Sequence, residues 1–334
     1  MLADSFLLYF DGDGGPAKGR PARATWQSES VKSVKSVHLG TAYSYCEQLA
    51  KQHYENFPVA SRLLPAKLRP HVAAIYAFAR TADDFADEPG YHSGERMRLL
   101  RDWRAKLHPP SRSGASAGQG RSGDDAIFIA LLDTIDRFSL PLQLFDDLLN
   151  AFVQDVGTTR YSTWADVLDY CSRSANPVGR LVLRLNGYHD DRLDAASDAV
   201  CTALQLTNFW QDLAIDWSRG RLYVPEEIWR AHHAEVASLD ARQMTAQWKA
   251  AMVDCGVRTR ELFQRGRPVC DDVSGRLRYE LRATWLGGMR ILERLDRAGY
   301  DVFTSRPTLG AADALVIAWE TLLWRETPPF PTRS

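Results

Sequence analysis

Apolar residues recur at helical spacing along most of this chain, and this pattern restricts the fold more than any other feature. Ile127, Leu131, Ile135 and Phe138, for example, fall on one face of a helix. Stretches in which apolar and polar residues alternate strictly, as in a half-buried strand, are scarce, and no interval recurs as an internal repeat. We therefore predict an all-α fold.

Length and composition favour one large helical domain with two polar segments. The chain has 334 residues, of which 45% are hydrophobic and 25% charged, as in ordinary globular proteins. Residues 11–36 are rich in Gly, Pro, Ser and Lys, so we predict a disordered extension over residues 1–36. Residues 108–125 have the same character and predict a flexible surface loop. The rest, residues 37–328, is predicted to form a single all-helical domain.

Charge and cysteine content argue against several classes of function. A formal net charge of −1 gives no electrostatic reason to expect nucleic acid as a partner. The five cysteines are scattered and lack CxxC spacing, so neither a disulfide framework nor a zinc site is expected. A cytoplasmic location is the default for such a chain.

A hydrophobic segment near the carboxyl end is too short to span a bilayer. Residues 311–324 (AADALVIAWETLLW) are interrupted by Asp313 and Glu320 and fall short of the ~20 residues that a spanning helix needs. We predict a packed helix here. Peripheral contact of part of this helix with the inner membrane is the alternative.

The segment YAFARTADDFAD sets three carboxylates among small and aromatic residues. On a helix, Tyr76, Arg80, Asp83 and Asp87 fall within about 60° of one another, with Asp84 just to one side. The plainer interpretation is a solvated acidic face in which Arg80 pairs with Asp83 or Asp84. The alternative is a binding site in which these carboxylates meet a positively charged group.

A second segment, QLTNFWQDLAID, favours the alternative. Gln205, Asn208, Asp212 and Asp216 recur every three or four residues, again among apolar side chains. Two oxygen-rich helical faces in one all-α chain suggest a shared cavity. Carboxylates around one cavity repel each other, so they raise their pKa values or bind cations. Mg²⁺ is the usual cation where a phosphate completes the oxygen shell.

Both motifs, together with three further segments, resemble the squalene/phytoene synthase family. The further segments are HYENF from His53, YCSRSANPVG from Tyr170 and GRLYVP from Gly220, and all five occur in the family's order. The resemblance implies a single-domain isoprenoid synthase fold with helices around a central cavity. It also implies an enzyme that acts on isoprenoid diphosphates with Mg²⁺ as cofactor. Pro177 is expected to break a helix beside the cavity.

Within the family, FARTADDFADE, SANPVGRLVL and QLTNFWQD resemble most the bacterial hydroxysqualene synthases of hopanoid biosynthesis. That resemblance implies a Mg²⁺-dependent conversion of presqualene diphosphate and water to hydroxysqualene, with release of diphosphate. Relatives that couple two prenyl diphosphates usually carry Arg where this chain has Gln211, and the neutral residue favours a substrate with one diphosphate. Head-to-head coupling to presqualene diphosphate, squalene or phytoene is the alternative within the family. A non-catalytic helical assembly factor is the alternative of another class, and the oligomeric state stays open.

The resemblance assigns roles to residues of these segments. As metal ligands it implies Asp83, Asp84, Asp87, Asn208, Asp212 and Asp216. As contacts of the isoprenoid diphosphate it implies His53, Tyr76, Arg80, Gln205, Arg221 and Tyr223. For catalysis, in the sense of neutralising the leaving diphosphate, it implies Asp83, Asp87, Asp212, Tyr76 and Arg80.

Overall fold

The computed structural model of the 334-residue chain describes residues 39–52, 65–87, 90–108 and 122–325. Within these ranges every regular element is a helix, apart from an isolated bridge between Arg160 and Leu222. The all-α prediction is therefore confirmed.

The helices differ widely in length, and the longest, α10, carries the second motif. The amino-terminal helices are α2 (Leu39–Gln52), α4 (Arg69–Asp87), α5 (Ser93–Leu107), α6 (Ser122–Phe138), α7 (Leu142–Asp155), α8 (Trp164–Ser174) and α9 (Asn176–Leu185). They are followed by α10 (Asp191–Ser218), α11 (Glu226–Ala231), α12 (Val236–Asp240), α13 (Ala246–Gly266), α14 (Val269–Asp272), α15 (Gly275–Arg297) and α16 (Ala311–Leu323).

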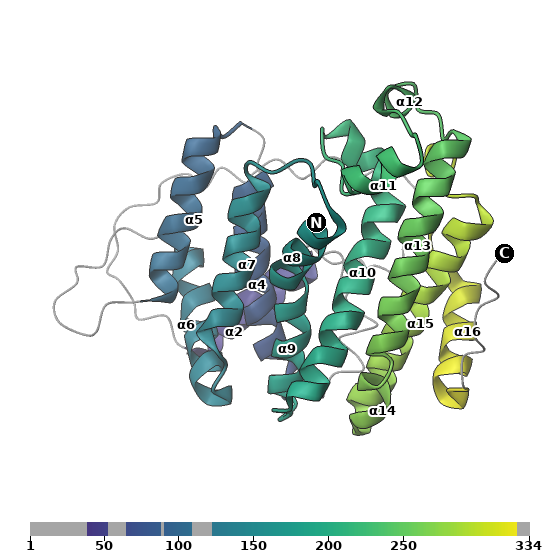
Figure 1. Cartoon of the computed structure of the whole chain (residues 1–334). Helices are drawn as coiled ribbons and strands as arrows, with labels where there is room; N and C mark the ends of the chain where they lie inside the picture. The colour runs from purple at the N-terminus through teal and green to yellow at the C-terminus, as the bar shows by residue number, and fades with distance from the viewer. Residues whose placement is uncertain (1–38, 53–64, 88–89, 109–121, 326–334) are drawn as a thin grey trace.

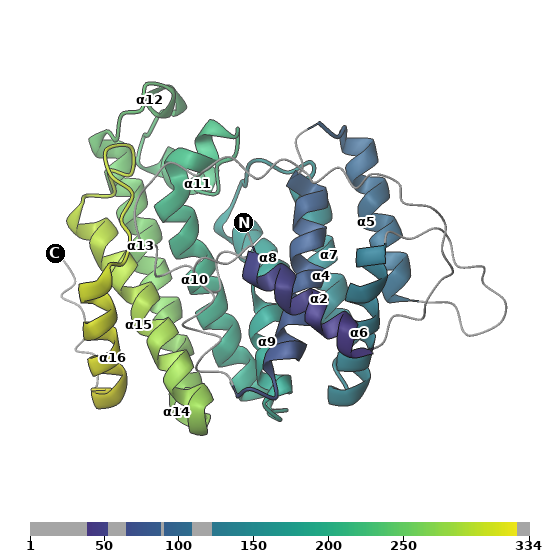
Figure 2. The same cartoon turned by 180° about the vertical axis from the view of Figure 1, so that it is seen from behind.

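Most of the long helices stand side by side in an array that runs from α5 at one end to α16 at the other (Figure 1). Helix α2 crosses this array obliquely and packs on α4 and α6 (Figure 2). Helix α10 packs on α9 on one side and on α13 and α15 on the other. The two acidic motifs therefore lie on helices in different parts of the array, with α8 and α9 drawn between them (Figure 1).

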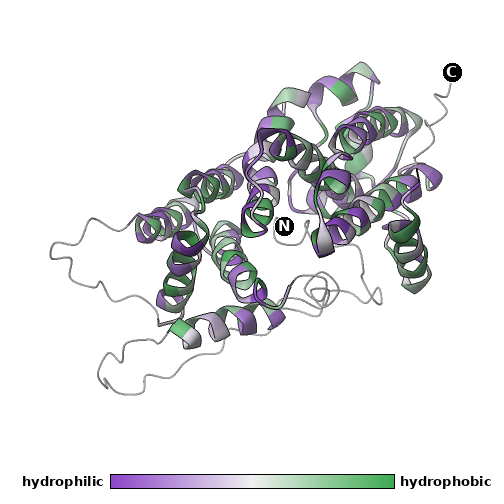
Figure 3. Cartoon of the chain, turned by 90° about the horizontal axis from the view of Figure 1, so that it is seen from below, coloured by the Kyte–Doolittle hydropathy of each residue, from purple (hydrophilic) through white to green (hydrophobic). Residues whose placement is uncertain are grey.

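The helices are positioned by amphipathic faces and by caps. Hydrophobic and hydrophilic segments alternate along most of them (Figure 3). Thr163 and Asp166 form a reciprocal capping box at the start of α8. Asp190 caps α10 by accepting hydrogen bonds from the first free amides of that helix. Trp210 on α10 is fully buried and donates from Nε1 to Thr259 Oγ1 of α13 at 2.9 Å, so it belongs to the core between these helices.

A break between α8 and α9 lets the chain turn beside α10. Ala175 interrupts the two helices, and Pro177 stands in the first turn of α9, where its missing amide hydrogen costs nothing. A side chain at Gly179 would collide with Ser197 and Cys201 of α10, so glycine allows α9 and α10 to approach closely. The predicted helix break at Pro177 is confirmed.

The two predicted polar segments fall largely outside the described residues. Nothing is described of residues 1–36, and the loop predicted at residues 108–125 is described only at its ends. Helix α6 begins at Ser122, so the last residues of that loop are helical.

Candidate active site

The first acidic motif lies on the second half of α4, and it is largely turned inward. Tyr76 is 8% exposed and Asp83 is 5% exposed. The guanidinium of Arg80 lies 2.8 Å from Asp84 Oδ1 and 3.8 Å from Asp83 Oδ2. The surface interpretation therefore holds only for the pair of Arg80 with Asp84, whereas Asp83 is a buried carboxylate.

The second motif lies on a face of α10 that is almost fully buried. Gln205 is 1% exposed, Asn208 3% and Asp216 1%. Within the described part of the chain, neither Oε1 nor Nε2 of Gln205 has a hydrogen-bond partner, and the same is true of Asp216 Oδ2. Because buried polar atoms are nearly always paired in native proteins, these atoms indicate a position that a polar ligand would fill.

Arg221 links the two motifs. It follows α10 after Gly220, whose φ of 80° is a conformation that glycine adopts without strain. Its Nη2 donates to Asp87 Oδ1 at 2.7 Å, at the end of α4. Burial alone would raise the pKa of Asp87, but the hydrogen bond and the charge of Arg221 outweigh burial and hold that pKa below its ordinary value. The carboxyl-terminal ends of α4 and α10 are thus joined.

Asp155, the last residue of α7, is a buried carboxyl beside the motifs that no sequence pattern indicated. Its Oδ2 accepts a hydrogen bond of 2.9 Å from the Tyr170 hydroxyl, and Oδ1 has no partner among the described residues. Burial raises the pKa of Asp155 to about 7, although Arg221 and the hydrogen bond from Tyr170 act in the opposite direction. This carboxyl can therefore exchange a proton near neutral pH.

Arg306 is a second residue of the site that the sequence did not reveal. It lies in the segment between α15 and α16, and its Nε is 2.5 Å from Asp212 Oδ1. Nearby, burial and then the charge of Asp212 raise the pKa of Asp216 to about 7. An arginine beside a proline in a segment without helical periodicity was the only signal in the sequence.

The structure shows what Gln211 contacts, and its expected effect on the choice of substrate stays a prediction. Its Nε2 donates to the carbonyl oxygen of Pro307 at 2.5 Å, so the side chain is directed at the segment that carries Arg306. The guanidinium of Arg306 reaches Asp212 from that segment. The second motif therefore has a positive partner that the neutral Gln211 alone does not indicate.

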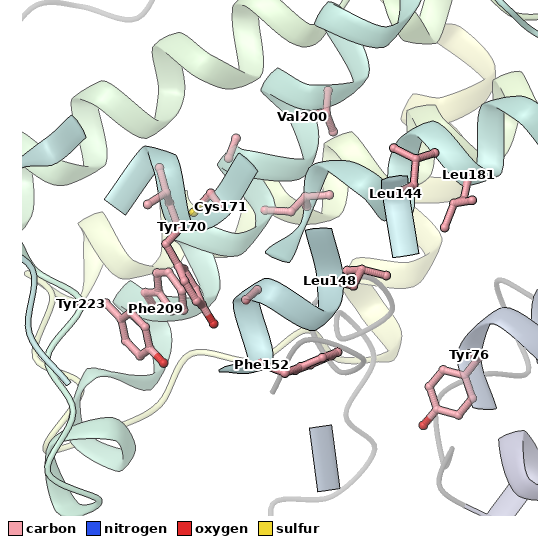
Figure 4. Close-up of a cluster of buried hydrophobic side chains, with 14 of the residues drawn as sticks. Tyr76, Leu144, Leu148, Phe152, Tyr170, Cys171, Leu181, Val200, Phe209 and Tyr223 are labelled. Carbon is pink, nitrogen blue, oxygen red and sulfur yellow. The ribbon is translucent and has the colours of Figure 1, made fainter. Parts of the chain in front are cut away.

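Aromatic rings from three segments gather beside Asp155. The rings of Phe209 and Tyr223 stack with their centroids 3.7 Å apart and their planes 3° apart, and Tyr170 lies 6.0 Å from Tyr223 (Figure 4). Tyr76 lies apart from this group, on α4 (Figure 4). The predicted site residues Tyr76 and Tyr223 are thus not members of one aromatic cluster (Figure 4).

The predicted metal ligands are suited to a site in which the substrate supplies part of the metal's coordination shell. They are less suited to a site in which protein side chains supply every ligand. Within the described ranges, no three His, Cys, Asp or Glu side chains converge closely enough to hold a metal ion. Asp84, Asp87 and Asp212 are paired with arginines. A hard cation that takes a few carboxylate oxygens and completes its shell with phosphate and water matches the preference of Mg²⁺. His53, predicted to contact the diphosphate, lies outside the described residues.

Known proteins share both the sequence pattern and the fold. The profile of the family described as Squalene/phytoene synthase matches residues 50–313. The chain belongs to the squalene/phytoene synthase family. This confirms the resemblance inferred from the motifs, and the family acts on isoprenoid diphosphates.

The relatives of this chain in the family carry more than one activity name. The hydroxysqualene synthase of Zymomonas mobilis subsp. mobilis is 33% identical over 246 residues, which are 72% of this chain and 77% of the relative. The phytoene synthase of Thermus thermophilus is 28% identical over 288 residues, which are 86% of this chain and 94% of the relative.

Solved structures confirm the isoprenoid synthase fold. The squalene synthase HpnC from Alicyclobacillus acidocaldarius is 37% identical and has a TM-score of 0.72, with 80% of this chain and 97% of that one covered. A dehydrosqualene synthase in complex with a ligand has the same TM-score at 21% identity, with 86% and 97% covered, and so shares the fold.

Proposed function

We propose that this protein converts presqualene diphosphate and water to hydroxysqualene, releasing diphosphate and a proton. The observation that carries the proposal is the arrangement around Arg221, which binds Asp87 of the first motif and adjoins the backbone of Asp155 at 3.4 Å. Carboxylates, unpartnered buried polar atoms and aromatic rings are neighbours there. The hydroxysqualene synthases among the relatives support the choice of product.

The diphosphate would be bound by arginines that now pair with the motifs. Arg80 and Arg221 stand at the first motif and Arg306 stands at the second. Guanidinium groups form short, charge-assisted and often bidentate hydrogen bonds with phosphate oxygens. The unpartnered amide of Gln205 would donate to a further oxygen of the substrate.

The carboxylates of both motifs would hold the cofactor. Mg²⁺ bound with the substrate supplies a Lewis acid that neutralises the leaving diphosphate. The side chains that would hold it are Asp83, Asp87, Asn208, Asp212 and Asp216. Asp84 is the weakest of the predicted ligands, since it is the ion-pair partner of Arg80 and the more exposed of that residue's two carboxylate neighbours.

The cluster of aromatic rings is suited to stabilise the carbocation that remains after the diphosphate has left. When the bond between carbon and oxygen breaks, the diphosphate leaves with the electron pair. Ring faces such as those of Phe209 and Tyr223 stabilise a neighbouring cation by about 0.5–2 kcal/mol each. Water then forms the new carbon–oxygen bond and loses a proton. Asp155 is the proposed acceptor, because its carboxyl titrates near neutral pH and Tyr170 fixes its position.

The test is turnover of presqualene diphosphate by the pure protein with Mg²⁺ and without a nicotinamide cofactor. In ¹⁸O-labelled water the expected product is hydroxysqualene that carries the label. An unlabelled alcohol, or a hydrocarbon, would refute water capture. The variant Asp212→Asn serves as the control for reaction at this site.

Head-to-head coupling is the second candidate, and Arg306 is the observation that favours it. The additional charge of a second diphosphate needs additional cations, and Arg306 brings one to the second motif. If farnesyl diphosphate alone gives presqualene diphosphate at a rate comparable to the first reaction, coupling is the better assignment. Turnover of neither substrate would favour a non-catalytic assembly factor.

A further inference from the structure

Helix α16 turns its apolar side outward. Leu315, Trp319 and Leu322 recur every three or four residues along it and are 75%, 63% and 67% exposed. Leu323 is 40% exposed beside them, and Glu320 is the one charged residue on the exposed side of this helix. A surface helix normally shows the reverse pattern, so this face is suited to an apolar environment.

Polar contacts hold the inner side of α16 against α15. Asp313 is 1% exposed, and its carboxylate lies 2.6 Å from Arg290 Nε and 2.6 Å from Arg294 Nη2. Asp313 also accepts the Gly310 amide and so caps the helix. These contacts fix the orientation of α16, so its apolar face is turned outward as a result of specific packing against α15.

A groove of about 320 Å³ lies between α15 and α16, next to the exposed face. Its lining includes Met289 and Trp324, two arginines (Arg267 and Arg325) and two carboxylates, Glu320 and Glu293, of which Glu293 pairs with Arg297. No carboxylate in the described part of the chain lies within ion-pair distance of either of these two arginines. Arg267 stacks over the Trp324 ring at 4.6 Å, and its Nη2 donates to the carbonyl oxygen of Arg325 at 3.0 Å.

We infer that the exposed face of α16 and this groove dock on the surface of a bilayer that contains anionic lipid. Leucine and tryptophan are the side chains that enter the interface of a membrane, and lipid phosphates are matched by Arg267 and Arg325. No helix in the described ranges is long and apolar enough to cross a membrane, so this contact is peripheral.

The advantage that docking on a bilayer gives the enzyme rests on the proposed function. A substrate with long prenyl chains and an alcohol product of the same size partition into lipid, so an enzyme at the bilayer surface exchanges them without passage through water. Docking itself depends only on the exposed apolar side chains of α16 and on the charge of the two arginines. Its test therefore uses no substrate.

The experiment is flotation of the full-length protein with vesicles of phosphatidylcholine, alone or mixed with phosphatidylglycerol. The wild type is expected to float with the anionic vesicles. The double variant Leu315→Asp/Trp319→Asp should lower the bound fraction by about tenfold or more, because two interfacial side chains become charged. The matched control is Val253→Asp/Val257→Asp, which changes two exposed valines with the same spacing on α13 and should float like the wild type.

Three outcomes would overturn the inference. The first is that the wild type and the α16 variant float equally, and the second is that the wild type does not float. The third is that the wild type is a dimer and the α16 variant a monomer, while neither binds vesicles. Turnover with detergent-dispersed substrate is measured alongside. If the α16 variant is active in detergent but does not float, docking and catalysis are separate properties. If the wild type floats but shows no turnover, docking is supported and the proposed function fails.

Discussion

Replacing Glu280 by glutamine is expected to stabilise the protein at alkaline pH, by an amount that falls as the pH is lowered. Glu280 lies on α15 and is 8% exposed, and its Oε2 has no hydrogen-bond partner among the described residues. Burial raises the pKa of this carboxyl to about 8, and no neighbouring charge contributes. The carboxylate form is thus disfavoured only by the loss of water.

The size of the effect follows from that pKa. Raising it from 4.5 to about 8 corresponds to about 5 kcal/mol, at ~1.36 kcal/mol per pKa unit. Below pH 4.5 the carboxyl is protonated in both states and has no such cost. Between pH 4.5 and 8 only the unfolded chain ionises, so the free energy of unfolding falls as the pH rises, and above pH 8 the loss is complete. Since a buried glutamine amide costs about 1–2 kcal/mol itself, the expected net gain above pH 8 is about 3 kcal/mol.

Urea unfolding of the wild type and Glu280→Gln at several pH values from acid to alkaline measures this difference. The variant should be the more stable protein at alkaline pH, and at acid pH it should be less stable than the wild type by the cost of the buried amide, about 1–2 kcal/mol. Glu261→Gln, which alters an exposed glutamate on α13, controls for the general effect of removing one negative charge. A stability difference that does not change with pH would mean that Glu280 ionises normally in the folded protein.

Three further outcomes are expected. Asp83→Asn and Asp212→Asn should each lower turnover by about a hundredfold or more while the fold is kept, because neutralisation of the leaving group is lost. The control Asp102→Asn, at an exposed ion pair, should leave turnover unchanged. Near-wild-type rates of either motif variant at limiting Mg²⁺ would contradict the proposed site. Asp155→Asn should remove the limb near pH 7 from the pH–rate profile, and an unchanged profile would exclude Asp155 as the proton acceptor. Deleting residues 1–34 should change neither melting temperature nor activity, and a large drop in melting temperature would show that this stretch joins the core.

The helices and the two motifs could be predicted because their patterns are local. One turn of helix brings Arg80 to Asp83 and Asp84, and the same geometry aligns Gln205 with Asn208. Spacing along the chain is sufficient for such contacts. It also predicts the break at Pro177, since a proline amide cannot continue a helical ladder.

The other members of the site come from segments that only tertiary packing brings together. Asp155 and Tyr170 lie on different helices, and Arg306 is 94 residues from Asp212. No periodicity relates such pairs. For this reason the neutral Gln211 did not indicate that a guanidinium reaches the second motif, since that charge comes from a distant segment that has no pattern of its own.

Helix α16 shows a different limit of sequence reasoning. Its hydropathy predicted a packed helix, and the structure packs it through Asp313 and two arginines while its leucines face outward. Average hydropathy predicts that a helix has an apolar face. It does not predict which face is turned inward when a buried ion pair competes with apolar contacts.

Arg221 and Arg306 have a further consequence for how ligands compete and cooperate in the site. Each is paired with a motif aspartate, Asp87 or Asp212, so the protein carries internal counterions at both motifs. A cation that takes the paired oxygen of either aspartate displaces a guanidinium, and the displaced guanidinium becomes available to an anion. Cation and anion therefore increase each other's affinity by the same factor, as thermodynamic linkage requires. Either one alone has to break an ion pair without the compensation that the other provides.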